Sequence, residues 1–83
     1  MAEPLIHLEV ITPEGTFLDD YVFYVLLPGS LCPFTVLPGH AALISSLDKG
    51  LIAFEGNDGE GSILIKSGFV RVQNNKVTAA IEF

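Results

Sequence analysis

The sequence predicts an all-β domain, a small antiparallel β-sandwich or flattened barrel of about 8–10 short strands. Three observations favour this class. Apolar and polar residues alternate over several short segments, most clearly in residues 5–11 and 76–82. Gly or Pro interrupts almost every stretch long enough for a helix, and no apolar helical period persists, so we expect no helix longer than about one turn. Two packed sheets would protect the edges of such short strands.

The elements follow from the alternation and from the turn residues between them. Residues 12–15 and 56–61 are predicted turns, and Asn74-Asn75 is a two-residue hairpin signal because Asn tolerates positive φ. Residues 41–47 form a short apolar segment. The expected strands are residues 5–11, 16–27 (one bent strand or two), 34–37, 51–55, 62–66, 69–73 and 76–82. The predicted core is Ile6, Leu8, Val10, Val25, Leu27, Val36, Leu51, Ile63, Ile65, Val70, Val72, Val77 and Ile81.

The triplet Leu-Pro-Gly occurs twice, at residues 27–29 and 37–39. Proline fixes φ at about −65° and glycine then permits positive φ, so each copy predicts a sharp turn at a strand end. His40 follows the second copy directly. This histidine is therefore either a turn residue that caps local backbone or a surface contact.

Composition limits the classes of protein to which the chain can belong. Its 83 residues make one domain, residues 1–83, and with 49% apolar and 17% charged residues it is too hydrophobic to be disordered. No uncharged run is long enough to cross a membrane, so we expect no direct membrane insertion. The net charge of −6, without a Lys/Arg cluster, argues against nucleic acid. A single cysteine and an N-terminus without a secretory signal predict a cytoplasmic protein.

The sequence lacks the common motifs of catalysis and metal binding. It has no phosphate-binding loop, no dinucleotide fingerprint and no Cys-x-x-Cys pair, and neither His7 nor His40 has a second ligand at metal spacing. We therefore expect no cofactor, no metal and no catalytic residue. Cys32 and His40 as nucleophile and base are the one enzyme alternative. Cys32 lies in an apolar loop without a cationic neighbour. In such a place a thiol behaves as a small hydrophobic side chain, and this interpretation is favoured over a nucleophile.

Residues 21–27 are apolar on both faces of the expected strand. A strand with one face in water would alternate instead, so something must cover the second face. Either a neighbouring part of the domain does so, or Phe23, Tyr24 and Leu26 form an apolar patch for a partner.

Four segments in order, residues 8–15, 26–30, 34–41 and 68–78, resemble the epsilon subunit of the rotary (F-type) ATP synthase. The resemblance spans nearly the whole chain but concerns only the N-terminal β-sandwich domain of that family. The most specific segment is Leu-Pro-Gly-His-Ala at residues 37–41, ten residues after the first Leu-Pro-Gly.

The resemblance implies a non-catalytic central-stalk subunit of the proton-translocating ATP synthase. Such a subunit clamps the gamma subunit to the membrane rotor ring of c subunits and couples proton-driven rotation to ATP synthesis. It would lie peripherally at the cytoplasmic face of the bacterial inner membrane. The resemblance places Thr12, His40, Ala41 and Ala42 against the gamma subunit, and Ser30, Leu31, Cys32, Pro33 and Phe34 against the rotor ring.

The chain departs from the family pattern in three places. Cys32 stands where the family has Gly and Pro33 where it has an acid, so shape and apolar contact would replace an ionic contact with the ring. Phe23, Tyr24 and Leu26 stand at positions that are often polar in the family, which suggests a drier interface than usual or an additional subunit. The family's C-terminal helical hairpin, which carries inhibition of hydrolysis and in some members ATP binding, is not expected within this chain, because it would follow Phe83. A naturally short subunit and a piece of a longer one both fit.

A function of another class also fits the composition. An acidic β-sandwich could be a peptide- or ligand-binding module that captures its ligand at an open sheet edge. Such a module needs a concave aromatic pocket, for which Tyr21, Phe23 and Tyr24 are the candidates.

Overall fold

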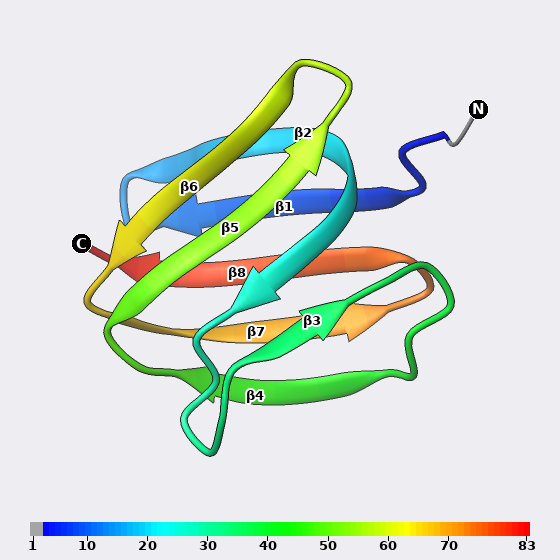
Figure 1. Cartoon of the computed structure of the whole chain (residues 1–83). Helices are drawn as coiled ribbons and strands as arrows, with labels where there is room; N and C mark the ends of the chain where they lie inside the picture. Colours follow the sequence, from blue (N-terminus) through cyan, green and yellow to red (C-terminus); the bar gives the residue numbers. More distant parts are fainter. Residues whose placement is uncertain (1–2) are drawn as a thin grey trace.

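A computed structural model of the chain describes residues 3–83 and contains eight strands joined by short turns (Figure 1). The all-β class and the sandwich are confirmed. Within the described residues there is no helix long and apolar enough to cross a membrane. The strands are β1 (Ile6–Thr12), β2 (Gly15–Leu27), β3 (Phe34–Val36), β4 (Leu43–Leu47), β5 (Gly50–Gly56), β6 (Gly59–Ile65), β7 (Ser67–Gln73) and β8 (Lys76–Glu82).

The strands follow the order β4-β7-β8-β1-β2-β5-β6, and β3 pairs with β2 beside this path. The long strand β2 belongs to both layers, because its first part pairs with β1 and its last part pairs with β3 and β5. An irregularity between Val22 and Tyr24 marks the change of partner from β1 to β5. Figure 1 shows β5 and β6 crossing in front of β1 and β8. One strand thus folds the sheet into a sandwich.

The first and last strands lie side by side and run parallel. His7 to Ile11 of β1 pair with Lys76 to Ala80 of β8, while all other strand pairs are antiparallel. The sheet is therefore mixed, whereas the sequence predicted a purely antiparallel one. Parallel neighbours need a long connection, and here nearly the whole domain forms it. No local turn signal announces such a pair.

The core is entirely apolar and gathers side chains from both layers. The predicted core residues are buried with one exception: Leu51 is 53% exposed, whereas its neighbour Ile52 is fully buried. Ile52 pairs with Ile63 of β6, and both point inward. The prediction failed because two adjacent apolar residues leave the face of a strand undecided. Val22, Leu47, Ile52 and Ala79 complete the core.

The two Pro-Gly turns differ. Gly39 has φ +84°, and the His40 backbone N–H donates to the Leu37 carbonyl at 3.1 Å, as expected for a turn. Gly29 does not have positive φ, so that part of the prediction was wrong. A Cβ atom at Gly29 would lie 2.6 Å from the Cys32 carbonyl oxygen, so glycine is needed there for space.

The hairpin turns agree more closely with expectation. Asn74 and Asn75 have φ of 51° and 61°, the two-residue geometry that their side chains tolerate. The predicted hairpin tip at residues 56–61 is shorter than expected, because β5 continues to Gly56 and β6 begins at Gly59. Gly61 lies within β6, where the Phe54 ring occupies the space that a side chain would need.

Candidate functional site

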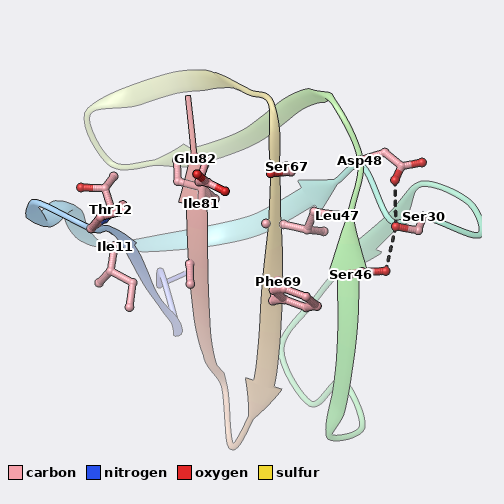
Figure 2. A pocket seen from close by; sticks show the side chains of 13 residues that line it. Ile11, Thr12, Ser30, Ser46, Leu47, Asp48, Ser67, Phe69, Ile81 and Glu82 are labelled. Atoms are coloured by element: carbon pink, nitrogen blue, oxygen red, sulfur yellow. Dashed lines mark hydrogen bonds between the residues drawn. The ribbon is translucent and has the colours of Figure 1, made fainter.

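A groove of about 550 Å³ lies on the outer face of the layer formed by β4, β7, β8 and β1. It occurs where β1, β8 and β4 end and β7 begins, because β7 and its neighbours β4 and β8 run in opposite directions. Figure 2 shows the strand ends side by side with the loop after β2. The groove is lined by residues 11–13, 80–82, 67–69, 46–48 and Ser30.

The floor of the groove is apolar because outward positions on three strands carry apolar side chains. Phe69 of β7 pairs with Ala80 of β8, which pairs with Ile11 of β1. Phe69 is 65% exposed, in contrast to its buried neighbour Val70. Gly68 precedes Phe69 in β7, and a Cβ atom there would lie 2.5 Å from the Ala80 carbonyl oxygen, so no side chain fits at this position.

One rim of the groove is a hydrogen-bonded contact between β4 and the loop after β2. The Ser30 hydroxyl donates to Asp48 Oδ1 at 2.9 Å, and the Ser46 hydroxyl donates to the Ser30 hydroxyl oxygen at 2.8 Å (Figure 2). Backbone bonds reinforce this contact: Ser30 N–H donates to the Ser46 carbonyl at 3.0 Å, and Asp48 N–H to the Pro28 carbonyl at 2.9 Å. The base of the loop is therefore fixed to the sandwich.

Thr12 forms the opposite rim. Its hydroxyl donates to the Gly15 carbonyl at 3.1 Å and accepts from the Glu14 backbone N–H at 3.2 Å. These bonds close the turn between β1 and β2 and hold Pro13 beside the groove. Both rims thus consist of ordered turns rather than free loops.

The residues expected at the gamma subunit do not gather at one place. Thr12 lies at the groove, whereas residues 40–42 precede β4 at the opposite end of the same layer. His40 is half-buried, its Nδ1 atom lies 2.7 Å from the Ala41 carbonyl oxygen, and Gly39 N–H donates to Asn75 Oδ1 at 2.8 Å. In the isolated chain His40 therefore acts as a turn residue.

The residues expected at the rotor ring form a loop with an apolar tip. Leu31 is fully exposed, and Cys32 and Pro33 are exposed beside it. Phe34 is half-buried and packs against the core, while Ser30 lines the groove. The loop thus joins the groove at its base and presents uncharged side chains at its tip.

The expected apolar patch on β2 is partly covered by the domain itself. Phe23 and Tyr24 are half-buried, and Leu26 remains 40% exposed. Burial raises the pKa of the Tyr24 phenol, and the neighbouring carboxylates of Glu55 and Glu60 raise that pKa further.

The aromatic residues proposed for a ligand pocket contact different parts of the domain. Tyr21 stacks on His7 with ring centroids 4.8 Å apart, and His7 Nε2 lies 2.6 Å from Asp19 Oδ1. Tyr24 instead lines a hollow with Phe54. Tyr21 and Phe23 do not line that hollow, so the three candidate residues do not form one aromatic pocket.

Cys32 and His40 lie near opposite ends of β4. The loop of Cys32 is fixed to the end of β4 through the bridge between Gly29 and Leu47, whereas His40 precedes its beginning. Five strand residues between these ends span roughly 17 Å. The geometry does not bring the thiol and the imidazole together.

Sequence reasoning missed most of the groove. Ile11 and Phe69 are outward-facing apolar residues on otherwise polar faces, and this signal is visible in the alternation of each strand. Asp48 and Glu82 at the groove gave no such signal, because acidic residues at strand ends are common on any surface.

Comparison with known proteins gives relatives in one family. The family described as "ATP synthase, Delta/Epsilon chain, beta-sandwich domain" matches residues 5–82. The ATP synthase epsilon chain of Sulfurovum sp. (strain NBC37-1) is 47% identical over 79 residues, covering 94% of this chain and 62% of the relative. That of Campylobacter fetus subsp. fetus (strain 82-40) is 42% identical over 78 residues, covering 93% and 60%. The chain therefore spans about three fifths of these relatives.

Solved structures show the same fold at low sequence identity. A chain of the Euglena gracilis mitochondrial ATP synthase structure superposes with a TM-score of 0.86 and 20% identity, covering 98% of this chain and 52% of its own. A chain from the Tetrahymena thermophila mitochondrial ATP synthase central stalk and c-ring superposes with a TM-score of 0.77 and 16% identity. This match covers 100% of this chain and 67% of the other. The family match, supported by this fold, confirms the resemblance, and the chain belongs to the beta-sandwich domain family of ATP synthase delta and epsilon chains.

Proposed function

We propose that the chain is the β-sandwich part of a non-catalytic central-stalk subunit of a proton-translocating ATP synthase. In this role it clamps the gamma subunit to the membrane rotor ring of c subunits, so that proton-driven rotation is coupled to ATP synthesis. The subunit is peripheral, at the cytoplasmic face of the bacterial inner membrane. The names of its relatives and its family membership support this role.

The observation that carries the proposal is the open apolar groove between Thr12 and Ser30. A shaft and a ring that turn together need a long-lived contact, and such interfaces have apolar cores with few charges. We place the gamma subunit on the outer face of β4, β7, β8 and β1. A partner that covers this face reaches Thr12 at one end and residues 40–42 at the other.

The rotor ring meets the loop of residues 30–34 in this proposal. The tip of the loop carries Leu31, Cys32 and Pro33 without a charge, so its contact with the ring is apolar. The hydrogen bonds of Ser30 to Ser46 of β4 and to Asp48 hold the loop in place under torque. The loop and the groove share Ser30, and the two contacts are therefore adjacent.

A matched pair of variants tests the groove. Phe69→Glu places a charge on the floor of the groove, while Leu64→Glu places the same charge at a similarly exposed position, 61% against 65%, on β6 of the other layer. We expect the wild-type chain and Leu64→Glu to form a one-to-one complex with the cognate gamma subunit in native mass spectrometry. Phe69→Glu should lose the complex, because a buried unpaired charge is costly.

Three outcomes would count against the proposal. The wild-type chain could fail to bind gamma, Phe69→Glu could bind as well as wild type, or the groove could instead pair two copies of this chain. Circular dichroism of both variants shows whether each is folded before its binding is compared.

A further inference from the structure

The apolar groove carries two acidic side chains at one end. Glu82 of β8 pairs across the sheet with Ser67 of β7, and the pairing of Leu47 with Gly68 places the following residue, Asp48, beside Ser67. Both acids are exposed and line the groove (Figure 2). They stand two strand spacings apart, about 10 Å between backbones, with the small Ser67 between them.

Among residues 3–83, no basic side chain lines the groove or pairs with either acid. The chain has four Lys and Arg residues, and the described lining of the groove contains none of them. The Arg71 guanidinium donates to Gln73 Oε1 at 2.6 Å, farther along β7 and away from the groove. In the part of the chain that the structure describes, neither the Lys76–Glu9 salt bridge nor the contact between His7 and Asp19 involves Asp48 or Glu82. The groove therefore offers an apolar floor with an unpaired negative end.

The two acids also retain free hydrogen-bond acceptors. Asp48 uses Oδ1 to accept from the Ser30 hydroxyl, which leaves Oδ2 for a partner. That same bond fixes the direction of the carboxylate. Ser67 adds a hydroxyl between the acids. Arginine presents five N–H donors in a planar fork, a geometry that suits carboxylate oxygen atoms better than a compact ammonium does.

We propose that the segment of the gamma subunit seated in this groove combines an apolar side chain with an adjacent basic residue. The apolar side chain packs on Phe69, Ala80 and Ile11, and the basic side chain, preferably arginine, lies between Asp48 and Glu82. This inference rests on the proposed function and adds the chemistry of the partner. The apolar contact makes the complex long-lived, and the charged contact fixes the position of the partner along the groove.

Paired double variants of equal charge test this arrangement. Asp48→Asn with Glu82→Gln removes both groove charges, and the amide that replaces the Asp48 carboxylate still offers an oxygen to Ser30. Asp58→Asn with Glu60→Gln removes the same two charges from the exposed hairpin of β5 and β6, outside the groove lining. Binding of each to the cognate gamma subunit is measured by isothermal titration calorimetry at low and high salt.

We expect the groove variant to bind about tenfold more weakly than wild type at low salt, the size expected for two solvent-accessible charge contacts. The difference should shrink in about 1 M salt, where the Debye length falls to about 3 Å. The hairpin variant should bind nearly as wild type at both salt concentrations. Equal losses in both double variants would mean general attraction by net charge and would overturn the inference.

The outcomes separate this inference from the function on which it rests. If the groove variant binds gamma as tightly as wild type at low salt, the basic partner is wrong while the proposed function stands. If the wild-type chain does not bind gamma at all, the proposed function fails and the inference fails with it.

Discussion

Gly29 shapes the loop after β2 through the side chain that it lacks. A Cβ atom there would lie 2.6 Å from the Cys32 carbonyl oxygen and 2.9 Å from the Phe34 ring. Gly39, in the second Leu-Pro-Gly, has nothing within 4 Å of such an atom but has φ +84°. The same triplet therefore uses glycine for space at one position and for backbone conformation at the other.

This difference predicts opposite orders of stability for two substitutions. At position 39 we expect Asn to be tolerated better than Ala, because Asn accepts positive φ more readily, with Ala costing about 1–2 kcal/mol. At position 29 we expect Ala to cost about 1–3 kcal/mol through overpacking, and the larger Asn to cost more. Urea unfolding of the four variants measures the order. The same order at both positions would contradict this account.

The sequence could not distinguish the two glycines. The triplet predicts a turn at both places, and both turns exist. The atoms that exclude a side chain at Gly29 belong to Cys32 and Phe34, and their approach depends on how the whole loop folds back. Local rules describe dihedral angles well, whereas close contacts are decided by tertiary structure.

At the scale of elements, clean alternation decided what was predictable. In β8, Val77, Ala79 and Ile81 alternate with polar or small residues, and both the bounds and the inward face were predicted correctly. In β5, Leu51 and Ile52 are adjacent apolar residues, and the sequence favoured the wrong one. The parallel pairing of β1 with β8 left no local trace because it joins the two most distant strands.

The orientation of β5 can be tested with two alanine substitutions. Ile52→Ala removes a fully buried side chain and should lower the free energy of unfolding by about 2–5 kcal/mol. Leu51→Ala trims a side chain that is 53% exposed and should change stability by about 0.5 kcal/mol or less. Equilibrium urea denaturation compares both with wild type. Similar losses would mean that Leu51 is buried as well.

At the scale of the molecule, one residue of each candidate contact lies at the same end of the sandwich. Thr12 and Ser30 line the same groove although 18 positions separate them in sequence. The sequence named both residues through family resemblance but assigned them to different partners. Their proximity depends on β1 and β4 ending at the same edge of the layer, which follows from sheet order and strand direction.

The arrangement also predicts where a cross-linker would react. Cys32 is the chain's single cysteine and is exposed, so a photoreactive maleimide attached to it in the assembled synthase should form an adduct with a c subunit. As a control, Cys32→Ser with Asp58→Cys moves the label to the hairpin at the far end of β5, roughly 20 Å away. That label should give no such adduct. Mass spectrometry identifies the products, and a Cys32 adduct with gamma alone would count against the ring contact.

The parallel pair has a consequence for the time at which the domain can fold. β8 lies between β1 and β7, so the last of the eight described strands in chain order fills a central place in the layer. While a ribosome still covers residues 76–82, β1 lacks one neighbour and β7 lacks its hairpin partner, and the apolar faces of both stay open to water. The layer therefore cannot close until residues 76–82 have emerged, and in that interval the unpaired strand edges of the nascent chain are open to other chains.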